Sequence, residues 1–215
     1  MWFVRSVCVV IGLCLSTSVG LAAPLKVGDK APVFTLKALN PDVIGTKYVS
    51  LGKMVGAKAR PAHKGVLLSF FATYCEPCKK ELPYLAKLYD LFNQEGFSIV
   101  LVSIDEDKEK VEEAGVLAAK SGARFPVVSD RFNIVAKRYQ ISELPTMFFV
   151  DGLGKIVMAK SGYSQDISGE LLSGIRQALG KPTAAPVPDS LQAYFPKKAG
   201  EGDAGLGDAA PSSVQ

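Results

Sequence analysis

The feature that most constrains this chain is a Cys-x-x-Cys pair, Cys75 and Cys78, placed where an apolar strand should give way to a helix. The stretch from Gly65 to Ala72 is almost continuously apolar, as in a strand that is covered on both faces. From Glu76 to Asn93 apolar residues recur at helical spacing, and Gly96 follows as a stop signal. The pair is therefore predicted at the first turn of a helix that follows a central strand.

The remaining pattern predicts an α/β fold. Elements of both kinds alternate along the chain, with strands expected at 97–104, 146–150 and 155–160 and helices at 106–121, 130–139 and 165–179. Strands that are linked by helices predict a central, mixed, mostly parallel β-sheet flanked by helices, and the last two strands form an antiparallel hairpin. A strand at 33–37 and a second near 48–51 predict an N-terminal β extension.

The two ends of the chain differ from this pattern. Residues 1–22 resemble a signal peptide, because Arg5 precedes the short apolar run 7–15 and small residues follow. We expect cleavage after Ala22 and an exported, periplasmic or extracytoplasmic protein. The alternative is that the segment stays uncleaved and anchors the protein to a membrane. We expect residues 23–180 to form one domain, and 181–215, rich in Pro, Ala, Gly and Ser, to form a disordered tail.

Charge excludes one class of function. Without residues 1–22 the chain has 24 basic and 21 acidic residues, a formal charge of +3 that is scattered along the sequence. Nucleic-acid binding depends on a concentrated basic face. We therefore expect no nucleic-acid partner.

The cysteine arrangement indicates reactivity rather than structural stapling. After removal of the leader only Cys75 and Cys78 remain, and a bridge across so short a loop removes little unfolded-state entropy. Unpaired N–H groups at a helix start stabilise a thiolate, so the pKa of Cys75 should lie below the free value of about 8.5. Cys75 is then the nucleophile and Cys78 the resolving thiol.

A zinc site is the structural alternative for such a pair. It would need further Cys or His ligands, whereas the mature chain has only His63. We expect no metal, and no cofactor beyond the redox-active Cys75–Cys78 disulfide.

The segment from Phe70 to Pro83 resembles the active-site strand and helix of TlpA/ResA-type thioredoxin-like proteins, within the AhpC/TSA/redoxin superfamily. The likeness extends from the opening at 27–34 to the segment at 146–152 and covers roughly residues 26–180. One departure is Tyr74, where the family usually has Trp. The resemblance implies a thioredoxin fold.

The resemblance also assigns further site residues. It implies that Pro145 is a cis proline facing the disulfide and that Leu144 presents backbone groups to a substrate segment, beside Tyr74. Glu76 and Pro77 would tune the redox couple, and the acidic Glu76 favours a reductant.

Glu81 has two readings. Family members use a carboxylate at this position, which could exchange a proton with the resolving thiol if it is partly buried. The alternative is an exposed helix-surface glutamate that pairs with a lysine.

The leading functional hypothesis is an enzyme, a thiol-disulfide oxidoreductase that reduces disulfides in exported proteins, with apocytochrome c as a substrate suggested by the family. Its partners would be protein disulfides and a membrane thiol reductant of the DsbD/CcdA type, and the protein itself is expected to be a monomer. One alternative is a peroxiredoxin-like peroxidase, since Thr73 stands near Cys75. Another is a non-catalytic thioredoxin-fold binding module.

Overall fold

The computed structural model describes residues 25–60, 62–162 and 167–195. The leader expected at residues 1–22 and the tail beyond residue 195 lie outside the described residues. The described strands form a seven-stranded sheet in the order β2-β1-β5-β4-β3-β6-β7. Their bounds are β1 Thr35–Ala38, β2 Tyr48–Ser50, β3 Gly65–Phe71, β4 Phe97–Ser103, β5 Val127–Ser129, β6 Thr146–Asp151 and β7 Ile156–Ser161.

The sheet is mixed, but the prediction that it is mostly parallel is wrong. Only β3, β4 and β5, which are joined through helices, pair in parallel. The pairs β1–β2, β1–β5, β3–β6 and β6–β7 are antiparallel. The reason is that the antiparallel pairs β1–β2 and β6–β7 flank a parallel centre of three strands, and each joins that centre through a further antiparallel contact, β1 with β5 and β6 with β3.

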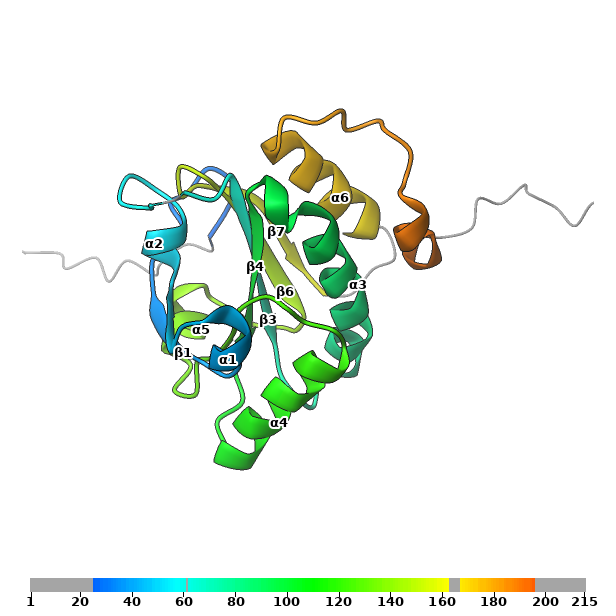
Figure 1. Cartoon of the computed structure of the whole chain (residues 1–215). Helices are drawn as coiled ribbons and strands as arrows, with labels where there is room; N and C mark the ends of the chain where they lie inside the picture. Colours follow the sequence, from blue (N-terminus) through cyan, green and yellow to red (C-terminus); the bar gives the residue numbers. More distant parts are fainter. Residues whose placement is uncertain (1–24, 61, 163–166, 196–215) are drawn as a thin grey trace, which may run out of the picture.

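Helices cover both faces of this sheet (Figure 1). On one face, α3, α4 and α6 pack over Leu67, Phe71, Ile99 and Leu101. The opposite face, with Val66 and Leu68, is covered by α5, α2 and the N-terminal segment. The helices are α1 Pro41–Ile44, α2 Leu51–Met54, α3 Glu76–Phe92, α4 Lys108–Lys120, α5 Ile134–Arg138 and α6 Ile167–Ala178, with the 3-10 turns η1 Asn93–Glu95 and η2 Asp189–Tyr194. Because β3 is buried on both faces, its continuous apolar run is explained.

The predicted N-terminal β extension is confirmed. β1 and β2 pair as an antiparallel ribbon, and β1 also pairs with β5, where Lys37 lies opposite Ser129. The extension therefore completes the sheet on the side of β5, far from the closing hairpin β6–β7.

The prediction of a disordered tail from residue 181 is wrong for residues 181–195. η2 packs against α3 with Leu191 fully buried, and the rings of Tyr194 and Phe195 contact Tyr84. The buried guanidinium of Arg176 donates hydrogen bonds to two backbone carbonyls of the same segment, those of residues 185 and 186. A few apolar side chains and one arginine thus hold a segment whose average composition is that of a solvated chain.

Among the residues that the structure describes, no helix combines the length and the apolar character needed to cross a membrane.

Candidate active site

The two cysteines lie where β3 runs into α3, as the sequence predicts. Cys75 is the N-cap residue of α3, and Pro77 occupies the first turn, where a missing N–H costs no helical hydrogen bond. A disulfide joins Cys75 to Cys78, and the Sγ of Cys75 accepts a hydrogen bond from the backbone N–H of Cys78 at 3.3 Å. The sulfur of Cys75 thus lies at the positive end of a helix of 17 residues.

The two cysteine residues differ in access to solvent. Cys75 is 7% exposed, whereas Cys78 is 1% exposed and belongs to the core between α3 and the sheet. A partner that approaches from solvent therefore meets Cys75 first.

A cavity of about 550 Å³ opens over Cys75. It brings together four residues that the sequence assigned to substrate binding, namely Tyr74, Glu76, Pro77 and Leu144. Four residues that sequence reasoning missed complete its lining: Ile104, Ile141, Ser142 and Glu143. The segments 74–77 and 141–144 are far apart in the sequence, yet they form two walls of one groove beside the disulfide.

The peptide bond between Leu144 and Pro145 is cis, as expected, but Pro145 does not line the cavity over Cys75. Pro145 itself is buried, and its carbonyl accepts a hydrogen bond from the N–H of Gly162 at 2.8 Å. Leu144 is the residue of this pair that reaches the cavity.

Glu76 lies at the exposed rim of the site. Its carboxylate forms an ion pair of 2.7 Å with Lys79, one helical turn later. The pair partly balances the negative charge that Glu76 places beside the nucleophile.

Glu81 is buried, so the alternative of an exposed helix-surface glutamate is wrong. It is 5% exposed, and its Oε1 has no hydrogen-bond partner among the described residues. Burial raises the pKa of Glu81 from 4.5 to about 7, because the ionised form loses its hydration. Because its pKa lies near 7, Glu81 can gain or lose a proton near neutral pH. Its side chain belongs to the helical turn that follows Cys78.

Asp105 supports the loop that leads to Cys75, and sequence reasoning missed it. Its buried carboxylate accepts hydrogen bonds from the backbone N–H of Thr73, from the hydroxyl of Thr73 at 2.8 Å and from the hydroxyl of Ser103 at 2.9 Å. A signal was present, because Asp105 follows the buried strand β4, whose end lies beside the end of β3 in a parallel pair. An acidic residue at that position is placed to reach the neighbouring loop.

No cluster of three metal-ligating side chains occurs within the described part of the chain.

Comparison with known proteins identifies the relatives of this site. Residues 27–159 match the AhpC/TSA family. The chain belongs to this family. Thiol-disulfide oxidoreductase ResA of Bacillus subtilis (strain 168) is 38% identical over 135 residues, which cover 63% of this chain and 67% of that protein. ResA of Geobacillus thermodenitrificans (strain NG80-2) is 40% identical over 93 residues, or 43% of this chain and 52% of that protein.

A solved structure supports the same assignment for this AhpC/TSA-family chain. A Chlorobium tepidum protein, described as a thiol:disulfide interchange protein DsbE, superimposes with a TM-score of 0.61 and 28% identity, and the match covers 73% of this chain and 99% of that one. These matches confirm the expected resemblance and the thioredoxin fold. They also confirm the class of enzyme, a thioredoxin-like thiol-disulfide oxidoreductase. The chain spans about half to two thirds of the length of these two curated relatives.

Proposed function

We propose that this protein is an exported oxidoreductase that reduces disulfides in extracytoplasmic proteins by cycling Cys75 and Cys78 between dithiol and disulfide. The observation that carries the proposal is the Cys75–Cys78 bridge at the start of α3, next to an open cavity lined by Leu144. The apolar run at residues 7–15 supports export.

Cys75 performs the first step of the reductive half-cycle. Its thiolate is stabilised by the N–H of Cys78 and by the positive end of α3. The thiolate attacks one sulfur of a client disulfide, a bond forms between Cys75 and that sulfur, and the other client sulfur leaves as a thiolate. The product is a mixed disulfide through Cys75.

Cys78 resolves this intermediate with the help of Glu81. The ionised carboxylate of Glu81 takes the proton of the Cys78 thiol, and the Cys78 thiolate attacks the sulfur of Cys75. The bond to the client breaks, so the client leaves fully reduced and the Cys75–Cys78 bridge re-forms. A pKa of about 7 makes Glu81 able both to accept and to return a proton near neutral pH.

The finer features of the proposal come from the family resemblance. Apocytochrome c before haem attachment is the proposed client, and a membrane thiol reductant of the DsbD/CcdA type is the proposed source of electrons. The acidic rim residue Glu76 favours a reductant, since it limits the extra stabilisation of the Cys75 thiolate. We propose that the protein acts as a monomer.

The reduction potential of the Cys75/Cys78 couple tests the direction of electron flow. The protein is equilibrated in defined thiol buffers and the mass shift after alkylation is measured. A value near the thioredoxin figure of about −270 mV is expected, whereas a value near about −120 mV would indicate a disulfide donor.

Insulin reduction with dithiothreitol measures activity, and the double variant Cys75→Ser, Cys78→Ser should be inactive. Full activity of that variant would favour a binding module.

Peroxide reduction finds no support in the site. The hydroxyl of Thr73 donates its hydrogen bond to Asp105 and so serves the loop that precedes the nucleophile. Consumption of peroxide with a thiol donor at the rate of insulin reduction would reverse this conclusion.

A further inference from the structure

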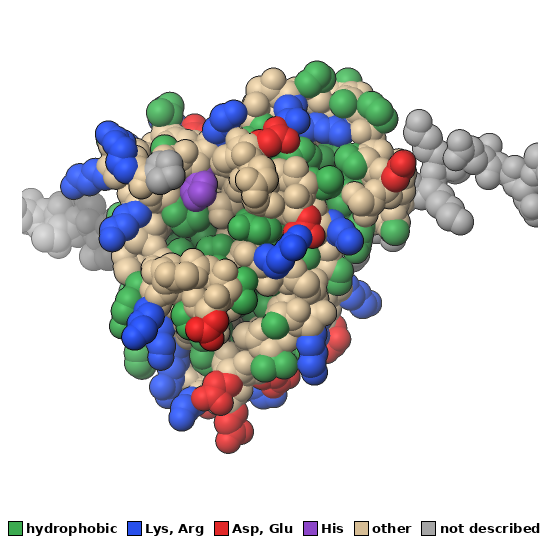
Figure 2. All heavy atoms as spheres, in the orientation of Figure 1, with side chains coloured by type: hydrophobic (Ala, Val, Ile, Leu, Met, Phe, Trp, Pro, Cys, Tyr) green, Lys and Arg blue, Asp and Glu red, His purple; other side chains and the backbone are tan. Residues whose placement is uncertain are grey.

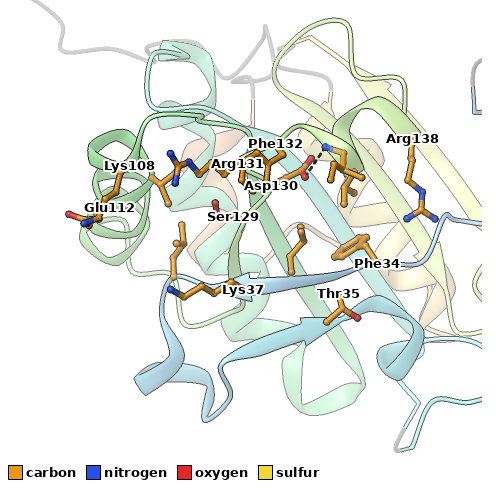
Figure 3. Close-up of a pocket in the computed structure, with 15 residues that line it drawn as sticks. Phe34, Thr35, Lys37, Lys108, Glu112, Ser129, Asp130, Arg131, Phe132 and Arg138 are labelled. Atoms are coloured by element: carbon orange, nitrogen blue, oxygen red, sulfur yellow. Dashed lines mark hydrogen bonds and ion pairs between the residues drawn. The ribbon is translucent and has the colours of Figure 1, made fainter.

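A second cavity lies between β1, α4 and the turn that leads into α5, and the redox cycle does not use it (Figure 3). Its volume is about 550 Å³, within the range of ligand-binding clefts. Much of its lining is apolar and comes from three elements that the sequence separates widely: Phe34, Leu36, Leu39, Val111 and Val135. We call this cavity the basic groove, for the charges described below.

Two large apolar side chains of the basic groove remain in solvent. Phe132 is 74% exposed and Ile134 is 58% exposed. A rigid turn holds them there, because the buried carboxylate of Asp130 accepts hydrogen bonds from the backbone N–H groups of Ile134 and Ala136. Exposed aromatic and aliphatic side chains at the mouth of an apolar cavity are typical of a surface that binds a macromolecular partner.

The rim of the groove is positively charged. Lys108 and Arg131 lie on one side of the cavity and Arg138 lies on the other, with Lys37 below (Figure 3). Basic side chains also gather along the lower left border of the molecule in Figure 2, where Figure 1 places β1 and α5.

The acidic residues of the lining do not balance this charge. Asp130 is buried and accepts hydrogen bonds from backbone N–H groups, and Glu112 forms an ion pair of 3.9 Å with Lys108, so two acidic residues face four basic ones. Within the described part of the chain, Lys37 and Arg138 form no ion pair. The groove is therefore complementary to an occupant that carries both carboxylates and apolar side chains.

The groove is connected to the redox site through Glu106. The carbonyl of Glu106 accepts a hydrogen bond from Nε of Arg131 at 2.8 Å, and its carboxylate accepts one from Asn133 at 2.6 Å. Glu106 and Asn133 also line a small cavity together with Tyr74, the neighbour of Cys75. Tyr74 thus lines both the cavity over Cys75 and the small cavity that Glu106 and Asn133 line.

We infer that the basic groove docks an acidic, apolar peptide segment of a protein redox partner while a cysteine of that partner reaches Cys75. The inference rests on the proposed thiol-disulfide exchange with proteins and adds the chemistry by which one partner is selected. Docking at a distance from Cys75 favours this partner without changing the reactivity of the disulfide itself.

The test measures the binding of two labelled peptides to the full chain in its oxidised form. In the first dodecapeptide, glutamates alternate with leucine and phenylalanine; in the second, every glutamate is replaced by lysine. Fluorescence anisotropy should show that the acidic peptide binds, and that the lysine peptide binds at least about tenfold more weakly. Equal binding of both peptides would overturn the inference.

Two variants with matched controls locate the binding site. Arg138→Glu and Phe132→Ala should each weaken binding of the acidic peptide about tenfold. The controls Lys87→Glu on α3 and Leu153→Ala in the β6–β7 turn alter exposed residues outside the groove and should leave binding unchanged. Circular dichroism melting checks that each variant is folded, and binding that survives both groove substitutions would exclude the groove.

Further measurements separate this inference from other occupants and from the proposed function. Displacement of the acidic peptide by equimolar decanoate would show a site for small apolar carboxylates and would overturn peptide docking. The Arg138→Glu variant should react with a small aromatic disulfide at the rate of the native chain. Cys75→Ser should bind the acidic peptide as tightly as the native chain but lose insulin reduction. Peptide binding therefore tests the docking inference independently of whether the redox proposal is correct.

Discussion

Replacing Glu81 by Gln should abolish a pH dependence of stability that the native chain owes to this one side chain. The folded protein holds the proton of Glu81 up to about pH 7, whereas the unfolded chain releases it near 4.5. The folded state therefore binds the proton more tightly, and its unfolding free energy falls as pH rises from about 4.5 to 7. A difference of this size corresponds to about 3 kcal/mol above pH 7.

The Glu81→Gln variant has a neutral side chain of similar shape at every pH. Relative to the native chain it should gain about 3 kcal/mol between pH 4 and pH 8, or about 6 to 12 °C in Tm for a protein of this size. Any cost of burying the amide is the same at both pH values, so it cancels in the comparison. Activity should move in the opposite direction, since Cys78 loses its proton acceptor and insulin reduction should fall by about a hundredfold.

The assay is urea denaturation of the oxidised protein, followed by circular dichroism at pH 4 and pH 8. The control is Glu109→Gln, because Glu109 is an exposed glutamate on α4. Its stability should keep the pH dependence of the native chain. If the native and Glu81→Gln proteins show parallel stability from pH 4 to pH 8, the carboxyl group does not carry the raised pKa and its assignment as proton acceptor is refuted.

Three further substitutions test other parts of the structure. Cys78→Ser should trap a client as a mixed disulfide on Cys75, seen on a non-reducing gel, and a trapped species in Cys75→Ser would contradict the assigned order of attack. Asp105→Ala removes the acceptor of the Thr73 and Ser103 hydrogen bonds and should lower the unfolding free energy by about 2 to 4 kcal/mol in urea titrations; a negligible loss would show that the loop is held otherwise. Leu191→Ala should cost about 2 to 5 kcal/mol in the same assay, and an unchanged midpoint would show that η2 adds nothing to folding.

The redox centre could be predicted closely because its signals are local. All of these signals lie within some thirty residues. They are the apolar run of β3, the helical spacing after Cys78 and the position of the two cysteines between strand and helix. Periodicity therefore placed both elements to within a residue or two.

Strand direction and very short strands were not predictable in the same way. An apolar segment such as β6 has the same pattern whether it runs parallel or antiparallel to β3, so the sequence did not reveal its direction. β5 was missed altogether because Val127–Ser129 is too short to show a period. Both elements are specified by the partners that they meet in the folded sheet.

The segment 181–195 and the surroundings of Glu81 show a second limit. The composition of this segment indicates a solvated chain, but three apolar side chains and the buried Arg176 decide its position. The spacing of Glu81 from Cys78 suggested its proximity, whereas its burial depends on packing across elements. Average properties of a segment do not reveal such individual contacts.

The two outer strands of the sheet have a consequence for self-association. β2 has only three residues, so it offers a short backbone ladder to another chain. β7 is irregular in its pairing with β6, and it carries Lys160, whose ammonium group pairs with Glu170 on α6. Edge strands that are short, irregular or charged resist pairing with a strand of another chain. The sheet is therefore a poor template for strands of other chains, even though the cavity over Cys75 is open to them.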